Sequence, residues 1–248
     1  MKTGLVLSGG GARGIAHLGV LKALDEEGIK PDIISGVSSG AICAVMYSAG
    51  LKPDEILNYL LKLRIYKYFR PSWSNIGLLN IERLMPVFNM YLPFKTFEEL
   101  QIPIIISAAD FRSGQTVFFS SGELLKPVLA SSCIPILFAP LKYKDRLLVD
   151  GGVVNNLPVE PILAKVDYII GSHCNPNNPD YSIKSMRSVI ERTFNLAIAS
   201  NIKERKDHCH LFIEPEGLRN FRIFDLGKAK DIYNIGYKHA KERLKSLN

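Results

Sequence analysis

Short runs of apolar residues alternate along the chain with longer amphipathic stretches. The apolar runs predict strands at Leu5–Ser8, Ile33–Ser35, Ile104–Ala108, Val117–Ser120, Leu147–Val149, Tyr168–Gly171 and Leu211–Glu214. The stretches between and after them predict helices at Ile15–Glu27, Ala41–Ala49, Asp54–Lys62, Ile81–Met90, Glu123–Ser131, Lys184–Arg205 and Asp225–Ser246. Strands that alternate with helices favour a three-layer α/β/α fold with a largely parallel central sheet.

The size of the chain fits one domain. At 248 residues, of which 47% are hydrophobic, it can bury a large core, and no linker, repeat or low-complexity stretch divides it. We therefore expect a single catalytic domain over residues 1–248. Residues 60–95 lie between two core elements and are expected to form a cap or lid, and residues 225–246 a C-terminal helix.

A serine stands at the turn between the second predicted strand and the following helix. The pentapeptide is Gly36-Val37-Ser38-Ser39-Gly40. This Gly-x-Ser-x-Gly pattern is typical of a nucleophile elbow, in which a sharp strand-to-helix turn exposes the serine hydroxyl at the edge of the sheet. The pentapeptide alone also occurs in flexible loops, so its interpretation depends on the rest of the chain.

The first predicted strand runs into a loop with three consecutive glycines. The residues that matter there are Gly9, Gly10, Gly11, Arg13 and Gly14. Successive glycines let backbone amides point into one cavity and let an anion come close, as an oxyanion hole requires. Arg13 places a positive charge beside the loop.

The same loop also fits the dinucleotide-binding pattern Gly-x-Gly-x-x-Gly after a strand. That pattern requires an acidic residue at the end of the next strand, where it would hold a ribose. The next strand instead ends at Ser38, with Asp32 at its start. The dinucleotide interpretation therefore fails at the position that tests it.

A carboxylate follows a later predicted strand. Asp150 comes directly after the run Leu147–Val149 and is followed by Gly151 and Gly152. Asp-Gly-Gly is common in ordinary turns, but an acid at the rim of a sheet could serve as the base that a serine nucleophile needs. Partial burial would strengthen that base, because it raises the pKa of a carboxyl group.

Histidine is the usual base, and the chain contains His17, His173, His208, His210 and His239. None lies in an obvious catalytic loop. For His17 the sequence favours packing or capping behind the glycine loop. His173 follows a predicted strand and is the one alternative for a triad. The simpler arrangement is a dyad in which Asp150 takes the proton directly from Ser38.

These three motifs, in this order, resemble the patatin-like phospholipase family, over most of the chain from Gly4 to about Leu226. The resemblance implies an α/β/α acyl hydrolase with a Ser–Asp dyad. It assigns Ser38 as the nucleophile, Asp150 as the general base and the amides of Gly9, Gly10 and Gly11 as the oxyanion hole. Arg13, Gly14, Gly36, Gly40, Gly151 and Gly152 complete the motifs. Val37 and Ser39 depart from the residues usual beside the family's serine.

No metal or other cofactor is expected, since the glycine loop and the dyad supply both required functions. The cluster His208-Cys209-His210 with His173-Cys174 lacks helical or knuckle spacing. The four cysteines, Cys43, Cys133, Cys174 and Cys209, are scattered and fit free thiols in a reducing compartment. We therefore expect a cytoplasmic protein.

The net charge of +7 raises the question of anionic partners. The basic residues are spread out without a nucleic-acid-binding motif, so no nucleic-acid partner is expected. No segment is predicted to span a membrane or to act as a signal peptide. The stretch Leu60–Trp73 combines four positive charges with aromatic residues, which supports a hypothesis of peripheral contact with the inner membrane surface. An amphipathic helix packed on the core fits the same stretch.

Three classes of function remain open. The leading hypothesis is a hydrolase of fatty-acyl esters in (phospho)lipids. The second is the same chemistry on another acyl donor, as in a thioesterase or acyltransferase. The third is a regulatory protein that keeps the fold and acts through partners, which the intact serine, aspartate and glycine loop argue against. The pattern leaves the oligomeric state open.

Overall fold

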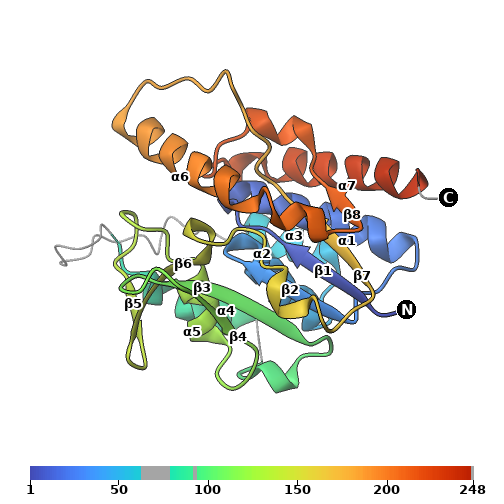
Figure 1. Cartoon of the computed structure of the whole chain (residues 1–248), viewed down its shortest axis with the longest axis horizontal. Coiled ribbons are helices and arrows are strands. Elements are labelled where there is room, and N and C mark those ends of the chain that lie inside the picture. Colours follow the sequence, from blue (N-terminus) through green and yellow to red (C-terminus); the bar gives the residue numbers. More distant parts are fainter. Residues whose placement is uncertain (63–78, 92–93, 247–248) are drawn as a thin grey trace.

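The computed structural model describes residues 1–62, 79–91 and 94–246. Its centre is an eight-stranded sheet that follows the path β5-β6-β3-β2-β1-β7-β8, with β4 also paired to β3 (Figure 1). The strands are β1 Thr3–Leu7, β2 Ile33–Val37, β3 Ile104–Asp110, β4 Thr116–Phe119, β5 Leu141–Tyr143, β6 Arg146–Asp150, β7 Tyr168–Ser172 and β8 Leu211–Ile213. All seven predicted strands are present.

The sheet is parallel in its middle and antiparallel at one side. Strands β3, β2, β1, β7 and β8 run parallel, whereas β4, β5 and β6 pair in antiparallel fashion. The expected parallel sheet is thus confirmed for the centre, while β4 and β6 reverse direction. Strand β5 was not predicted, because its three residues before the Lys144-Asp145 turn are too short to show a period.

Helices cover the sheet on both faces. They are α1 Ala16–Glu26, α2 Ser39–Ser48, α3 Pro53–Lys62, α4 Met85–Tyr91, α5 Leu125–Ser131, α6 Met186–Ile202 and α7 Ala229–Lys245. Each lies within a few residues of a predicted helix. The predicted helices at Ile15 and Ile81 differ at their starts, where 3₁₀ turns precede α1 and α4.

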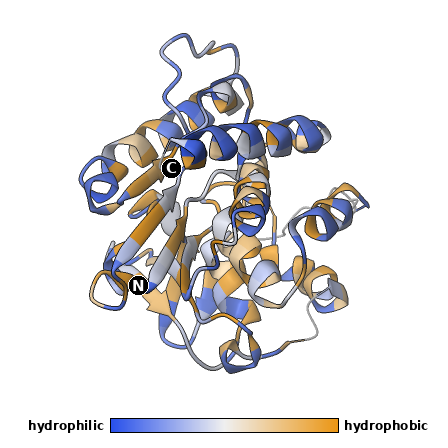
Figure 2. Ribbon diagram, turned by 90° about the vertical axis from the view of Figure 1, so that its right-hand side faces the viewer, coloured by the Kyte–Doolittle hydropathy of each residue, from blue (hydrophilic) through white to orange (hydrophobic). Residues whose placement is uncertain are grey.

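The alternation of side chains along the strands divides the core into two layers. Leu5 and Leu7 of β1 pack into the large cluster that includes residues of α1, α2 and α7. Val6, between them, faces the other way and packs in the cluster that contains Ile202 of α6. Figure 2 shows the apolar strands enclosed between helices whose outer surfaces are hydrophilic. This is the three-layer arrangement that the alternating pattern predicted.

The C-terminal helix belongs to the core. Its inner face buries Ala229, Ile232, Tyr233, Gly236, Ala240 and Leu244. The axis crosses α1 closely, because a Cβ on Gly236 would lie 2.2 Å from the Ala16 carbonyl oxygen, and one on Gly19 would lie 2.2 Å from the Tyr233 carbonyl oxygen. Only glycine fits where two helix backbones approach so closely.

The predicted cap is described only in part. Residues 79–91 form a 3₁₀ turn and α4, which pack beside α5. Most of the basic, aromatic stretch Leu60–Trp73 lies outside the described residues. Among the helices that the structure describes, none is both long enough and apolar enough to cross a membrane.

Replacing Gly236 by alanine tests the contact between α1 and α7. Alanine favours a helix over glycine by about 1 kcal/mol, but its methyl group would collide with backbone atoms of Ala16. We therefore expect Gly236→Ala to lower the free energy of unfolding by about 1–3 kcal/mol in urea titrations. Gly227→Ala is the matched control, because a Cβ there meets nothing within 4 Å. Equal stabilities of the two variants would contradict this account.

Candidate active site

Ser38 occupies the turn between β2 and α2, as the elbow requires. Its backbone has φ 53° and ψ −125°, in the left-handed half of conformational space that non-glycine residues rarely adopt. The amide of Ser38 donates to the Ser131 Oγ over 2.7 Å, and its carbonyl accepts from the Ile42 amide at 3.1 Å. These bonds hold a conformation that costs about 1–3 kcal/mol.

The glycines around Ser38 permit close packing of the elbow. A Cβ on Gly40 would lie 2.4 Å from the Leu7 carbonyl oxygen, so any other residue would push α2 away from β1. Gly36 lies against the backbone of Ala41, where a Cβ would come within 3.0 Å. The turn is therefore as tight as the pentapeptide predicted.

Asp150 ends β6 and is 1% exposed. Its Oδ1 accepts the Gly152 amide at 2.8 Å. Burial raises the pKa of the carboxyl group to about 7, and hydrogen bonding with the Ser38 hydroxyl and the Gly152 amide opposes that rise. A carboxylate that titrates near neutrality is suited to act as a general base.

Strand β3 explains why Ser38 and Asp150 meet. On β3, β2 pairs with residues 104–107 and β6 with residues 108–110. Strand β4 pairs with residues 106–109 of β3, a range that overlaps the segments paired with β2 and with β6. Because a strand has only two edges, β2 and β6 share the same edge of β3 and meet end to end. Val37 then stands opposite Ser107 and Asp150 opposite Ala108, so the two strand ends are adjacent.

The glycine loop leaves β1 and turns into the 3₁₀ helix η1, Gly11–Ile15. Gly11 has φ +58°, and a Cβ on it would lie 2.3 Å from the Ile223 carbonyl oxygen. In the part of the chain that the structure describes, no hydrogen bond occupies the amides of Gly10 and Gly11. These two amides are therefore available to an anion.

The third predicted donor is already engaged. The Gly9 amide donates to the Asn156 Oδ1 at 3.1 Å, while the Gly9 carbonyl accepts from the Asn156 Nδ2 at 3.2 Å. This corrects the expectation that all three glycine amides face an oxyanion. Gly9 instead fixes the loop, and a Cβ on it would lie 2.9 Å from the Ser38 Cβ.

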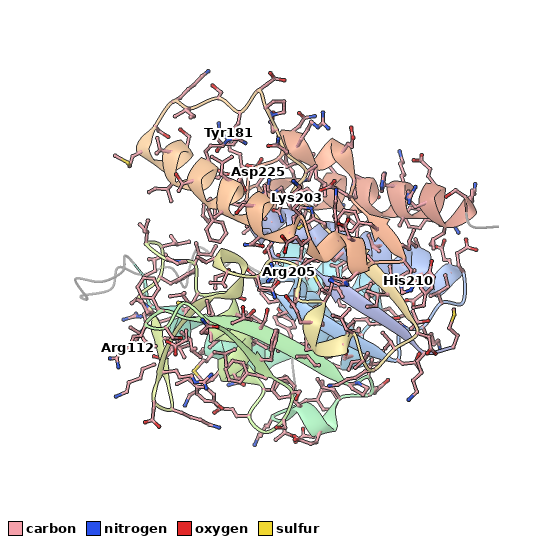
Figure 3. The ribbon with its side chains drawn as sticks, viewed as in Figure 1. Arg112, Tyr181, Lys203, Arg205, His210 and Asp225 are labelled. Atoms are coloured by element: carbon pink, nitrogen blue, oxygen red, sulfur yellow. The ribbon has the colours of Figure 1, made fainter. Side chains whose placement is uncertain are left out.

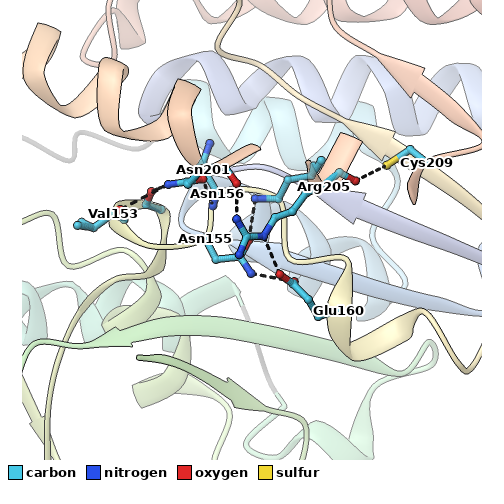
Figure 4. A network of polar contacts seen from close by, with 9 residues as sticks. Val153, Asn155, Asn156, Glu160, Asn201, Arg205 and Cys209 are labelled. Atoms are coloured by element: carbon cyan, nitrogen blue, oxygen red, sulfur yellow. Dashed lines mark hydrogen bonds and ion pairs between the residues drawn. The ribbon is translucent and has the colours of Figure 1, made fainter. Parts of the chain in front are cut away.

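Asn156 holds the glycine loop through hydrogen bonds that the sequence analysis missed. It is fully buried and also donates its backbone amide to the Asn201 Oδ1 at 2.9 Å. Asn201, on α6, in turn donates to the Gly152 carbonyl at 3.0 Å. Figure 4 shows this network, which continues from Asn201 to Arg205 and Glu160. In the sequence, the only local signal for it was an asparagine four residues after Asp-Gly-Gly.

The remaining motif residues have mainly structural contacts. Gly14 faces Ser39, whose Oγ a Cβ would meet at 2.1 Å, and Gly151 lies against the Ser107 carbonyl. The Arg13 side chain is buried and donates from Nη2 to the Asn195 Oδ1 of α6 at 2.7 Å. It therefore extends from the loop toward α6.

The structure gives the histidines other partners. The His17 ring contacts the Ser172 Oγ and the Ser8 carbonyl, both at 2.8 Å, and burial lowers its pKa to about 4. His173 Nδ1 pairs with the Glu214 Oε1 at 2.7 Å. Among the described residues no hydrogen bond joins a histidine to Ser38 or Asp150. His17 thus has the packing role behind the glycine loop that the sequence favoured.

The four cysteines are unbridged, and three of them are buried. Over residues 1–62, 79–91 and 94–246, no group of three or more histidine, cysteine or acidic side chains is arranged to hold a metal. His210, from the cluster considered above, accepts the Ile169 amide and stacks on Tyr168.

The pKa of Asp150 predicts how the reactivity of Ser38 changes with pH. A pKa raised to about 7 leaves the carboxyl group protonated in mild acid and ionised above neutrality. We expect the rate of labelling by a fluorophosphonate to rise between about pH 6 and pH 8. Intact-mass measurements would follow the adduct. A rate independent of pH over this range would exclude Asp150 as the base.

The role of Asn156 can be separated from general stability. Asn156→Ala removes both Asn156 bonds to Gly9, so the Gly9 amide loses its partner and the carbonyl keeps only the Cys174 and Asn175 side chains. We expect labelling of Ser38 to slow about tenfold or more. Asn89→Ala, at an exposed position on α4, is the control. Thermal unfolding of both variants would be recorded beside the labelling rates. An unchanged rate in folded Asn156→Ala protein would show that the clamp does not position the loop.

Comparison with known proteins agrees with this geometry. The family model described as patatin-like phospholipase matches residues 5–163. An NTE family protein of Mycobacterium bovis is 36% identical over 164 residues, which cover 65% of this chain and 45% of that protein. Lysophospholipase nte1 of Aspergillus terreus is 30% identical over 287 residues, covering 98% of this chain and 18% of that protein. The chain thus spans less than half the length of these curated relatives.

Solved structures share the fold at low identity. VipD of Legionella pneumophila matches with a TM-score of 0.67 at 15% identity, over 99% of this chain and 67% of that one. Human GIVD cytosolic phospholipase A2 matches with a TM-score of 0.56 at 12% identity, over 99% of this chain and 58% of that one. Because the matched residues 5–163 include the glycine loop, the serine elbow and Asp-Gly-Gly, the chain belongs to the patatin-like phospholipase family.

Proposed function

We propose that the chain hydrolyses fatty-acyl esters of lysophospholipids and phospholipids through Ser38 and Asp150. The observation that carries the proposal is the buried Asp150 carboxyl, with its pKa near 7, set against the hydroxyl of a serine in a strained elbow. Family membership and the relatives named lysophospholipase support an acyl ester as the substrate.

The first half of the proposed reaction acylates the serine. Asp150 takes the hydroxyl proton of Ser38 as the oxygen attacks the ester carbonyl carbon. The carbonyl oxygen becomes negative and accepts hydrogen bonds from the Gly10 and Gly11 amides, which no other group occupies among the described residues. Collapse of this intermediate breaks the ester bond, and protonated Asp150 gives its proton to the leaving alcohol.

The second half releases the fatty acid. Asp150, again ionised, takes a proton from water as the water oxygen attacks the acyl carbon on Ser38. The acyl–serine bond breaks and the proton returns to the Ser38 oxygen. Each step moves one proton through the same carboxyl group, so a pKa near the working pH serves both halves.

We further propose a cytoplasmic location with peripheral contact at the inner membrane surface. The four unbridged cysteines support a reducing compartment. The stretch Leu60–Trp73, which suggested membrane contact, lies mostly beyond the described residues, so contact rests on its sequence. Charge reversal there should weaken hydrolysis in vesicles more than hydrolysis of a soluble short-chain ester.

Substitution of the dyad tests the proposal through both activity and stability. Ser38→Ala and Asp150→Asn should each lower kcat for a lysophospholipid by about 10³-fold or more. Stability should also respond to the change. The pKa of Asp150 is raised in the folded state, so its contribution to the free energy of unfolding is present at low pH and is lost as pH rises from about 4 to 7. Asp150→Asn does not titrate, so it should stabilise the protein more at pH 8 than at pH 5.

Calorimetry at the two pH values would measure that difference. Exposed Asp145→Asn, in the turn before β6, is the matched control. Full activity of folded Ser38→Ala protein would refute the mechanism, and equal stabilisation at both pH values would refute the buried-base assignment.

A further inference from the structure

A pocket lies on the α6 side of the glycine loop, between α6, the segment 175–181 and the 3₁₀ helix η8, Glu216–Asn220. It is lined chiefly by cationic and amide side chains, among them Arg13, Arg192, Arg219, Asn175, Asn178 and Asn195. Arginine and asparagine are good partners for a phosphoryl group, and the pocket wall supplies both.

Arg13 is the central observation. Its side chain is 4% exposed, yet its Nε has no hydrogen-bond partner. The only side-chain partner in the described chain is the neutral Asn195. No described carboxylate oxygen lies within 4.0 Å of the guanidinium. A buried arginine is rare unless an anion pairs with it.

Two described carboxylates, those of Glu191 and Asp225, act on Arg13 only through longer-range charge, because neither forms an ion pair with it. Glu191 is buried on α6 and contributes a favourable charge to Arg13. Its Oε1, however, accepts the Ile223 amide at 2.9 Å, so it supports the segment that closes over Gly11. The guanidinium therefore faces the pocket with unused donors.

The other two arginines reinforce the positive wall. Arg192 donates to the Asn178 carbonyl at 3.0 Å and lies over the Tyr181 ring at 5.8 Å, both neutral partners. Arg219 pairs through Nη2 with Glu216, but its Nε is buried without a partner. Within the described chain, the pocket thus has two buried guanidinium Nε donors that remain unsatisfied.

We propose that this pocket binds a phosphoryl group, held by Arg13, Arg192 and Arg219. Arginine is suited to it, because the planar guanidinium offers parallel donors to phosphate oxygens. Arg13 stands two residues after Gly11, so the bound group would lie beside the glycine loop. The phosphoryl group could belong to a lipid headgroup or to free phosphate; the headgroup source rests on the proposed function.

The binding experiment needs no turnover. Inorganic phosphate is titrated into Ser38→Ala protein by isothermal calorimetry at constant ionic strength, alone and combined with Arg192→Gln or Arg219→Gln. We expect saturable binding that each arginine variant weakens about tenfold. The matched control is Arg112→Gln, in the exposed turn between β3 and β4, which lies well apart from Tyr181 and Asp225 (Figure 3). Thermal unfolding verifies that every variant is folded.

A kinetic experiment separates the two sources of phosphate. Lysophosphatidylcholine and a monoacylglycerol with the same acyl chain are compared as substrates of the otherwise wild-type enzyme and its arginine variants. A headgroup site predicts that Arg192→Gln and Arg219→Gln raise KM for the lysophospholipid alone. A site for free phosphate predicts weakened phosphate binding with both KM values unchanged. Either result supports the pocket.

Phosphate binding in the pocket and ester hydrolysis at Ser38 can be refuted independently of each other. Absence of saturable phosphate binding, together with equal effects on both esters, would overturn the pocket while leaving ester hydrolysis intact. Equal weakening by Arg112→Gln would also overturn it, because the binding would then be non-specific. Phosphate binding that depends on Arg192 and Arg219, in a protein that hydrolyses neither ester, would support the pocket and refute the proposed function.

Discussion

The end-to-end meeting of β2 and β6 on one edge of β3 is the constraint on which the site depends. It brings a serine and a carboxylate from residues far apart in the chain to adjacent positions. The two strands run in opposite directions, so their carboxyl ends face each other and both side chains leave the sheet at the junction. The reversal of β6 therefore places its carboxyl end, with Asp150, beside Ser38.

Burial at this junction controls the pKa of Asp150. Asp150 is covered on all sides, and desolvation raises the pKa of its carboxyl group. Hydrogen bonds from Gly152 and Ser38 keep the ionised form accessible. The surrounding amides are held by side chains from other layers, since Asn156 clamps Gly9 and Asn201 supports Gly152. Ser38 and Asp150 thus lie beside a hydrogen-bonded network between the sheet and α6.

Local signals were sufficient to predict the parts of the site that depend on backbone geometry. A serine between two glycines at a strand end predicts an elbow, and the structure shows one. The alternation of short apolar runs and helices likewise predicted the parallel centre of the sheet. Each of these features arises within a few residues, where steric limits on the chain leave few conformations.

The parts that were missed depend on contacts between distant residues. Asn156 and Asn201 are 45 positions apart and form a hydrogen bond only when α6 folds over the loop after β6. The occupation of the Gly9 amide by Asn156 spans 147 positions. The direction of β6 also depends on which edge of β3 is free. No periodicity within a segment carries this information, so sequence reasoning placed Asp150 at the rim without its supports.

The network through Asn201 has a consequence for the order in which the protein acquires its site during synthesis. The elbow and the glycine loop lie within residues 9–40, but Asp150 and the side chains that hold these turns, those of Ser131 and Asn156, come much later in the chain. Asn156 is bonded in turn to Asn201 of α6. A ribosome-bound chain that ends before α6 contains Ser38 without these assembled surroundings. The candidate site is therefore complete only after most of the chain has been synthesised.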